Sequence, residues 1–217
     1  MPRVRLDTEQ RREQLLRIGV ELLGTRPGDA LSIGAVARAA GVSKGLLYHY
    51  FRDKEQFFEA VVRAAGYELG RATEPDRALP PYQRVESAID GLITFAETHA
   101  AGFIAIFSGD LIVAGIADAL HDFRAARVAT FVEHIAEASE ADAEVVRASR
   151  ALRIVLAGQI VSLENSLLHW LEHQDIDREK LLRLLVQSFF MAMVGLATVE
   201  PELRLDSIIR VEDVVAP

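Results

Sequence analysis

Apolar residues recur at intervals of three and four positions along almost the whole of this chain of 217 residues. This interval places them on one face of an α-helix, whereas a half-buried strand requires strict alternation. In the first segment with this pattern, the shared face carries Leu15, Ile18, Gly19 and Leu22. The periodicity therefore predicts an all-α fold.

Polar residues stand where the first helices should begin. An Asp followed by Gln three residues later is a capping box, and such boxes open a first helix at Asp7 and a longer helix at Asp53. Between these two helices, Ser32 and Ser43 are each placed to cap a short helix. The first of these short helices is expected at 33–39, and the second should continue to Tyr50.

The remainder of the chain predicts a larger set of helices. Gly70 and a proline-containing linker over 75–81 should end the long helix. Five helical segments are then expected, the third of them either whole or broken, at 82–99, 103–107, 111–138, 142–173 and 177–198. The tail after Pro201 is expected to be loosely ordered.

Charge is unevenly distributed, although the whole chain carries a net charge of −8. Residues 1–54 hold ten Lys and Arg and six Asp and Glu, a net charge of +4, whereas residues 55–217 hold fourteen and twenty-six, a net charge of −12. A basic first part before an acidic remainder indicates a local anionic partner such as nucleic acid. The absence of cysteine excludes disulfides, thiolate metal sites and cysteine nucleophiles.

No secretory signal is expected, because the charged first residues are not followed by an apolar segment. The most apolar stretches, 100–117 and 184–199, are interpreted as buried helices. The first contains Asp110 near its middle, and the second is short for a membrane span. We therefore expect a cytoplasmic protein without a membrane partner.

A helix-turn-helix pattern occupies residues 32–51. Two short helices that cross steeply need a small residue at their contact, which Ala37 supplies, and a tight turn with positive φ, which suits Gly41. Val42 and Leu47 are spaced to fill the gap between the helices. The second helix of such a motif can lie in the major groove of DNA.

The side chains of that second helix suit contact with DNA. The first N–H groups and the Ser43 hydroxyl can bind an anion, Lys44 adds a positive charge, and Gly45 permits a close backbone approach. The rings of residues 48–50 can reach sugar, phosphate or a thymine methyl group. Lys54 opposes the dipole of the next helix, and a nearby phosphate would account for it. The alternative is an ordinary pair of core helices with solvated Lys and Tyr.

Taken together, residues 9–67 strongly resemble the DNA-binding head of the tetracycline-repressor (TetR) family of bacterial regulators. The resemblance rests on the first helix at 12–23, Leu31-Ser32-Ile33, Val36-Ala37, Ala40-Gly41-Val42-Ser43-Lys44-Gly45, Leu47-Tyr48-His49, Phe51 and Asp53-Lys54-Glu55. It implies a ligand-responsive transcriptional regulator, a repressor that binds a palindromic DNA operator as a homodimer. It also implies that a small lipophilic effector releases the DNA.

With the chemistry above, the resemblance assigns DNA contact to a set of residues in and around the motif. These residues are Ser32, Ser43, Lys44, Gly45, Leu46, Tyr48, His49, Tyr50 and Lys54. Two of them depart from the family pattern. The family usually has a small polar residue at the position of Leu46, so a methyl contact is expected in place of a hydrogen bond. It commonly has His at the position of Tyr50, which can still donate to phosphate but carries no charge.

The resemblance also divides the chain into parts. A helix-turn-helix DNA-binding domain of three helices is expected at 1–54, and a connecting helix with its linker at 55–80. A larger helical domain for effector binding and dimerisation should span 81–200, before the tail at 201–217. The connecting helix would carry the effector signal to the head.

The last two helical segments, 142–173 and 177–198, are apolar nearly all round. Such helices must be covered on two sides, and a second copy of the chain can provide the second cover as a four-helix bundle. The family resemblance likewise implies that they form the homodimer. The alternative is one large core without a partner.

The resemblance implies an effector pocket in the second domain. Candidate lining residues are Phe95, His99, Phe103, Phe107, Phe123, Arg127, Gln159 and Asn165. The two amides are the better indicators, because a buried amide needs hydrogen-bond partners. The alternative for the amides is that they pair across the dimer. Ile104, Phe131 and Leu163 add apolar walls, and His121, His134 and Glu164 are further polar candidates. The alternative for the phenylalanines is an ordinary core.

Other classes of protein are less consistent with the sequence. No phosphate-binding loop, nucleophile elbow or zinc-protease motif is present, so no catalytic residues and no cofactor are expected. His169 and His173 have a spacing that can bind a metal, but they stand at the end of a helix, where His is favoured anyway, and no metal is expected. A protein-interaction adaptor that has lost DNA binding is the main alternative, and a helical enzyme is a weaker one.

Overall fold

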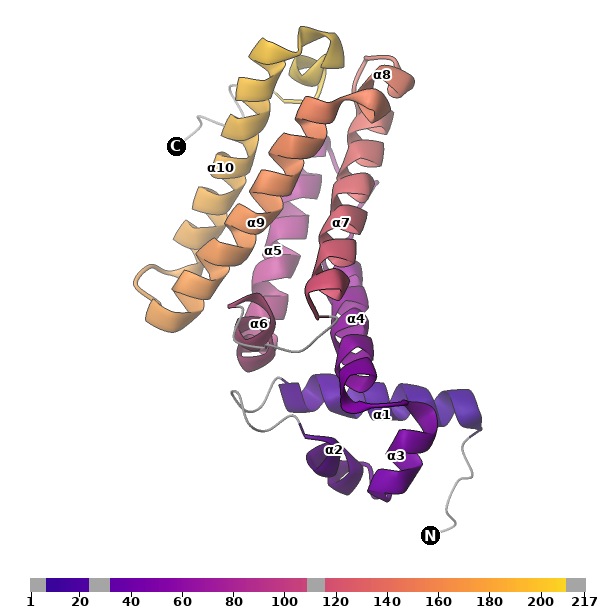
Figure 1. Ribbon diagram of the computed structural model, residues 1–217. Helices are drawn as coiled ribbons and strands as arrows, with labels where there is room; N and C mark the ends of the chain where they lie inside the picture. The colour runs from indigo at the N-terminus through magenta and orange to yellow at the C-terminus, as the bar shows by residue number, and fades with distance from the viewer. Residues whose placement is uncertain (1–6, 24–31, 109–115, 210–217) are drawn as a thin grey trace. The chain divides into compact units, whose positions relative to one another are not determined.

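The computed structural model describes residues 7–23, 32–108 and 116–209, and these residues contain helices and turns but no strand (Figure 1). The all-α prediction is confirmed. The helices are α1 Thr8–Leu23, α2 Ile33–Ala39, α3 Lys44–Tyr50, α4 Lys54–Ala72, α5 Pro81–Thr98, α6 Ala100–Phe107, α7 Ile116–Ala138, α8 Ala143–Ala148, α9 Arg150–His173 and α10 Arg178–Val199. The start expected for α7 at Leu111 lies outside the described residues.

The chain divides into two compact units. The head unit comprises residues 1–68 and 98–121, and the body unit comprises residues 69–97 and 122–217. Helices α4 and α7 contribute residues to both units. This division differs from the expected one, which placed 98–121 with the body. The physical reason is that α6 packs against α1, and Ile106 of α6 is buried in the same core as the first helices.

One apolar core holds the helices of the head unit together. Leu15 of α1, Val36 of α2, Leu47 of α3 and Phe57 of α4 are all fully buried in it. The Phe51 ring packs edge-on against the Phe57 ring, with 5.0 Å between centroids. A fully buried side chain of this size contributes about 2 kcal/mol through removal from water, so the short helices α2 and α3 are stabilised by this shared core.

The predicted helix caps are present. The Asp7 N–H donates to the Gln10 side chain at 3.2 Å, and the Gln10 N–H donates back to the Asp7 carboxylate at 2.8 Å. At α4 the Gln56 N–H likewise donates to the Asp53 carboxylate, but the Gln56 side chain accepts from the N–H of Arg52. In the second capping box, the Gln56 side chain therefore bonds to the N–H one residue before the cap, at Arg52 instead of Asp53.

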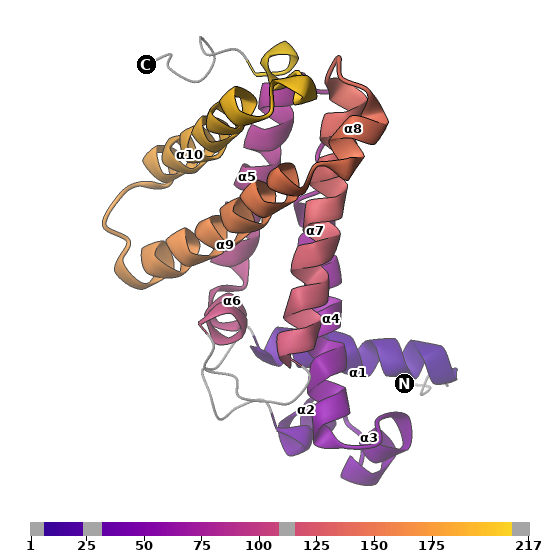
Figure 2. The ribbon, with the colours of Figure 1, turned by 45° about the horizontal axis from the view of Figure 1, so that its top comes forward.

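In the body unit, α9 and α10 run antiparallel beside each other, joined by a short turn that begins with Gln174 at φ 46° (Figures 1 and 2). Helix α5 approaches the end of α4 very closely. A methyl group added at Gly91 would stand 2.2 Å from the Ala72 carbonyl oxygen. Only glycine permits this backbone contact.

Three expectations about helix ends are wrong. Gly70 lies inside α4, which continues to Ala72. The expected helix over 142–173 is two helices, because Ser149 has extended backbone and its hydroxyl accepts from the Leu152 N–H to start α9. The tail is ordered as far as residue 209. It forms two 3₁₀ turns, Pro201–Leu203 and Leu205–Ser207, which bury Leu203, Leu205 and Ile209.

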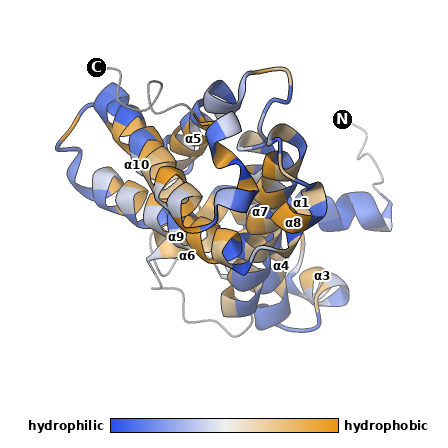
Figure 3. Cartoon of the chain, turned by 90° about the horizontal axis from the view of Figure 1, so that it is seen from above, coloured by the Kyte–Doolittle hydropathy of each residue, from blue (hydrophilic) through white to orange (hydrophobic). Residues whose placement is uncertain are grey.

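Helices α9 and α10 are long and apolar enough to cross a membrane by length and composition alone, yet only a third of their most apolar residues are buried within the chain. Figure 3 shows apolar residues along both helices. A second face remains exposed on each. On α9 it includes Ile154, Ala157, Gly158 and Val161, and on α10 it includes Leu184, Ser188, Met191 and Gly195. We call these eight residues the α9–α10 stripe.

Candidate DNA-binding surface and body cavity

Helices α2 and α3 have the geometry of a helix-turn-helix. Gly41 adopts φ +65° in the turn, and the Val42 N–H donates to the Ala37 carbonyl at 2.9 Å. Ala37 and Leu47 are buried where the two helices meet. The chain thus places a small residue, a glycine turn and an apolar plug at the positions that the sequence predicted.

Serine caps open both helices of the motif. The Ser32 hydroxyl accepts from the Ala35 N–H, and the Ser43 hydroxyl accepts from the Leu46 N–H, each at 3.1 Å. Both hydroxyls are exposed and retain a proton that can be donated. Such a hydroxyl, next to free N–H groups at a helix start, is able to bind a phosphate oxygen.

The outer face of α3 is open to solvent. Lys44, Gly45, Tyr48 and His49 are exposed, with the Tyr48 side chain 48% accessible. Large aromatic side chains on the surface of a recognition helix are available to base edges and sugars.

The other predicted contact residues are less exposed or lie beside the helix. Leu46 and Tyr50 are half-buried, and the Tyr50 ring meets the His49 ring edge-on at 5.4 Å. Lys54 is exposed, with its ammonium group 5.2 Å from the centre of the Phe58 ring. All nine predicted DNA-contact residues therefore lie in or directly beside the motif.

The positive charges of the motif lack partners, in contrast to those of α1. In α1, Arg17 forms an ion pair with Glu21 at 2.7 Å. Arg38, Lys44 and Lys54 form none with any residue that the structure describes. The Lys44 ammonium lies over α2, close to Gly34 and to the Arg38 guanidinium. A methyl group added at Gly34 would stand 3.4 Å from Lys44 Nζ and 3.6 Å from a guanidinium nitrogen of Arg38.

Two like charges held close together without a carboxylate favour an anionic partner. Sequence reasoning missed Arg38, although its position in the last turn of α2 could have indicated it. At the other side of α3, Arg52 pairs with Asp53 at 2.8 Å. The N–H of Gln56 and this guanidinium hold the pKa of Asp53 below its ordinary value.

The body unit contains a cavity of about 50 Å³ with almost entirely apolar walls, which we call the α4–α9 cavity. Its lining residues come from α4 and the residue that follows it, and from α5, α7 and α9. They are Leu69, Thr73, Ala88, Ile89, Leu92, Phe123, Arg127, Phe131, Ile160, Leu163 and Glu164. Few polar groups among apolar walls are typical of a small-molecule site.

Two buried charges stand in this wall. Glu164 accepts from the Arg124 guanidinium at 2.9 and 3.2 Å. Burial raises the pKa of Glu164, and the hydrogen bonds from Arg124 oppose that shift. Arg127 donates to the carbonyls of Thr73 at 3.1 Å and Gly70 at 3.4 Å, and burial lowers its pKa. The nearest carboxylate oxygen, on Glu74, is 3.8 Å away.

The structure separates the eight predicted effector residues. Phe123 and Arg127 line the α4–α9 cavity, as do Phe131, Leu163 and Glu164 from the wider set. Phe103 and Phe107 belong to the head unit, where their rings meet at 4.5 Å.

The other four, Phe95, His99, Gln159 and Asn165, are not among the residues that line this cavity. Asn165 is exposed, so the expectation of a buried amide there is wrong for the single chain.

Comparison with known families agrees with this geometry. The family model described as bacterial regulatory proteins, tetR family, matches residues 15–61, and the model described as tetracyclin repressor-like, C-terminal domain, matches residues 81–192. The chain belongs to the TetR family. Regulators of this family bind DNA operators and act as dimers with effector ligands.

Curated TetR-family relatives match over part of their length. The chain is 31% identical to the HTH-type transcriptional regulator BetI of Proteus mirabilis over 102 residues, which is 45% of this chain and 50% of BetI. It is 30% identical over 114 residues to the HTH-type transcriptional activator FasR of Mycolicibacterium smegmatis, which is half of each chain. The chain thus spans about half the length of these relatives.

Solved structures match over nearly the whole chain. A tetR-family transcriptional regulator from Streptomyces coelicolor shares 26% identity and a TM-score of 0.77, covering 93% of this chain and 88% of the other. The fatty acid degradation regulator FadR from Bacillus halodurans shares the fold, with a TM-score of 0.62 at 13% identity, over 85% of this chain and 96% of the other.

Proposed function

We propose that this TetR-family chain is a cytoplasmic repressor that binds a palindromic operator as a homodimer and releases it when a small lipophilic effector binds the body. The observation that carries this proposal is the surface of α2 and α3, where exposed cations that form no ion pair with a described residue surround a capped, exposed helix start. The proposed function involves no catalytic step.

The first step is DNA recognition by α3. Ser32 and Ser43 offer hydroxyl groups at two helix starts, and Arg38 and Lys44 offer charge between them. These groups fix the position of the helix on phosphates, which carry no sequence information. Tyr48, exposed on the same helix, is available for the base edges.

The second step is dimerisation through the α9–α10 stripe. Its apolar and small side chains are exposed on the single chain, with Leu184 and Met191 each 55% accessible. Apart from its chain neighbours and its own helix backbone, a methyl group added at Gly158 or Gly195 would have no atom of the described residues within 4 Å. Glycine and alanine on such a face let a second pair of helices approach closely, and two copies would then form a four-helix bundle.

The third step is release by an effector in the α4–α9 cavity. Leu69 and Thr73 of its wall belong to α4 or its end, and the same helix supplies Phe57 and Val61 to the core of the head. A ligand that fits one position of α4 better than another shifts the population of head arrangements. Only an effector with different affinities for these two arrangements can change operator affinity.

Selection from a pool of random DNA duplexes tests the proposal. We expect the selected sequences to converge on a palindrome whose half-sites lie about 10 base pairs apart, or a multiple of that spacing, because a dimer presents two copies of α3 to one face of the duplex. The selected duplex should bind about 1,000-fold more tightly than random DNA. A pool that never converges would contradict the proposal and favour an adaptor without specific DNA binding.

A further inference from the structure

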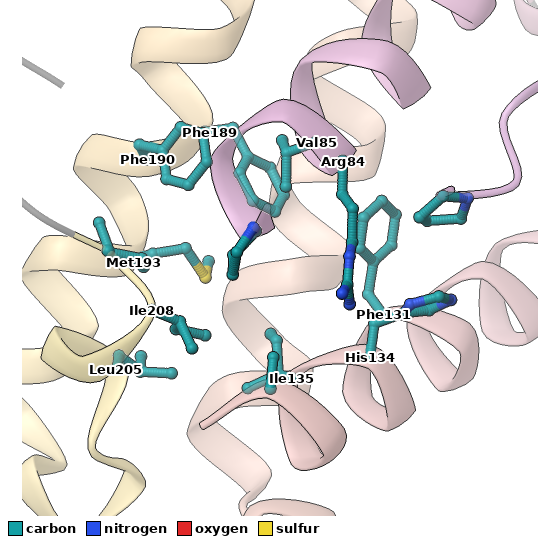
Figure 4. Close-up of a pocket in the computed structure, with 14 residues that line it drawn as sticks. Arg84, Val85, Phe131, His134, Ile135, Phe189, Phe190, Met193, Leu205 and Ile208 are labelled. Carbon is teal, nitrogen blue, oxygen red and sulfur yellow. The ribbon is translucent and has the colours of Figure 1, made fainter. Parts of the chain in front are cut away.

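A second cavity lies in the body unit, beneath the ordered end of the chain (Figure 4). It has a volume of about 50 Å³, several times the space that one water molecule needs. We call it the C-terminal cavity. Its apolar walls include Phe131, Phe189, Phe190, Met193, Leu205 and Ile208, so α7, α10 and the second 3₁₀ turn all contribute.

One polar side chain in this wall has no partner. His134 is 7% accessible, and neither of its ring nitrogens has a hydrogen-bond partner in the part of the chain that the structure describes. The nearest carboxylate oxygen, on Glu74, lies 3.9 Å from Nε2. A buried imidazole without any hydrogen bond is costly, by roughly 1–3 kcal/mol for each group left unsatisfied, and a ligand that bonds to it would remove that cost.

A guanidinium group stands on the same side of the cavity. Figure 4 shows Arg84 and His134 on one side, with Met193, Leu205 and Ile208 on the other. Arg84 donates from Nε to the Leu79 carbonyl at 2.7 Å and from Nη2 to the Arg77 carbonyl at 2.8 Å. Its Nη1 has no acceptor, and the group pairs with no carboxylate, among the described residues.

The charges that act on His134 come from the segment between α4 and α5, from α5 and from its own helix α7. Burial lowers the pKa of His134, Arg77 and Arg84 lower it further, and Glu74 and Glu137 act in the opposite direction. The charge of Arg77 is already matched by an ion pair with Glu137 at 2.9 Å. The charge of Arg84 is therefore the unmatched one at this end of the cavity.

From this arrangement we infer that the C-terminal cavity is a second ligand site, which takes a small apolar molecule with a single carboxylate. The carboxylate accepts from the free N–H groups of Arg84 and from one ring nitrogen of His134. The apolar part lies against the apolar wall that includes Phe131, Phe189 and Met193. Charge-assisted hydrogen bonds of this kind are roughly twice as strong as those between neutral groups.

This site is distinct from the α4–α9 cavity, although Phe131 lines both. The Phe131 ring lies 5.8 Å from the Arg127 guanidinium and 5.7 Å from the Phe189 ring. Neither Arg84 nor His134 lines the first cavity, and neither Arg127 nor Glu164 lines the second. The inference thus goes beyond the proposed function and does not depend on DNA binding.

Titration of the full chain with benzoate, followed through the histidine ring signals in NMR spectra, tests the inference. The His134 signal is assigned by its loss in His134→Gln, and the other five histidines serve as internal controls. We expect benzoate to shift the His134 signal saturably and to raise the pKa of His134, because a bound anion favours the protonated ring. Benzoate binding should therefore tighten as the pH is lowered.

Benzamide, which has the same shape without the charge, should bind about tenfold more weakly, since one charge-assisted contact contributes about 1.4 kcal/mol. Arg84→Gln should remove the preference for benzoate, and Arg84→Lys should retain part of it. Arg183→Gln, which changes an exposed arginine paired only with Glu179, is the matched control and should leave it unchanged.

Three results would overturn the inference. The His134 signal could remain unmoved by benzoate. Benzamide could bind as tightly as benzoate. Finally, Leu92→Trp, which fills the α4–α9 cavity, could abolish the response of His134, and the benzoate would then belong to that cavity. The comparison of benzoate with benzamide uses the unmodified chain, so it decides the matter even if Arg84→Gln fails to fold.

Discussion

Within the part of the chain that the structure describes, charged side chains are unpaired on the surface of α2 and α3 but paired in the interior of the body unit. Arg38 and Lys44 on the surface are exposed and have no carboxylate partner among the described residues, whereas Glu164 in the interior is buried and held by Arg124. The surface charges contribute little to the fold and are free to meet a partner. The interior charges must first satisfy each other, so substitutions there should change stability before they change binding.

The largest effect is expected from breaking the ion pair of Arg124 and Glu164, in which Glu164 is buried and Arg124 is partly exposed. Arg124→Met should lower the free energy of unfolding by about 3 kcal/mol, because it leaves Glu164 buried without its cation. Arg124→Met combined with Glu164→Met should recover most of that loss. Urea unfolding monitored by circular dichroism measures both. If the double variant were as unstable as the single one, the unpaired charge of Glu164 would not be the cause of the loss in Arg124→Met.

A charge in the α9–α10 stripe should separate the dimer. Leu184→Glu should weaken self-association at least 100-fold, about 2.7 kcal/mol, because a desolvated carboxylate would face apolar helices of the second copy. Sedimentation of the full chain measures this, and Arg183→Gln at the neighbouring position is the control. If Leu184→Glu remained fully dimeric, the stripe would not be the interface.

On the DNA-binding surface the effect should fall on binding alone. Lys44→Ala should weaken binding about tenfold on selected and random duplexes alike, and it should reduce the slope of log affinity against log salt by about 1. Its free energy of unfolding should stay within about 0.5 kcal/mol of the original, because Lys44 is exposed. A variant that loses stability or the dimer would place Lys44 among the structural residues.

The smallest effect is expected from the pH dependence of stability. Burial holds the pKa of His134 below its ordinary 6.5, so the unfolded chain binds more protons than the folded chain once the pH falls below that value. Stability from the neutral ring is thus present above pH 6.5 and is lost below it. His134→Gln should flatten this decline, measured by urea unfolding at about pH 7.5 and about pH 5.5. An unchanged decline would show that His134 titrates normally.

The same contrast explains what could be predicted from the sequence. Local signals were sufficient for the head, because Asp7, Ser32, Gly41 and Ser43 act within a few residues of themselves. The candidate DNA-contact residues could be proposed for the same reason, because they lie on one short helix and its neighbours; their contact with DNA stays a prediction.

The body could not be predicted in this detail. Periodicity places a residue on a helix face but does not say which helices meet, so Phe103 was expected beside a ligand and lies in the head unit. Ser149 is compatible with the middle of a helix, and only the tertiary structure shows that it divides 142–173. The ordered turns after Pro201 depend on a distant apolar surface that no local pattern reveals.

The most direct test of the central claim compares Tyr48→Ala with the original chain on the selected duplex and on random DNA, by fluorescence anisotropy at one salt concentration. If α3 reads bases through Tyr48, the loss on the selected duplex will exceed the loss on random DNA by about tenfold, or about 1.4 kcal/mol, which lies within the roughly 1–3 kcal/mol expected for a lost base contact. Equal losses on the two duplexes would contradict the claim that the exposed face of α3 recognises sequence.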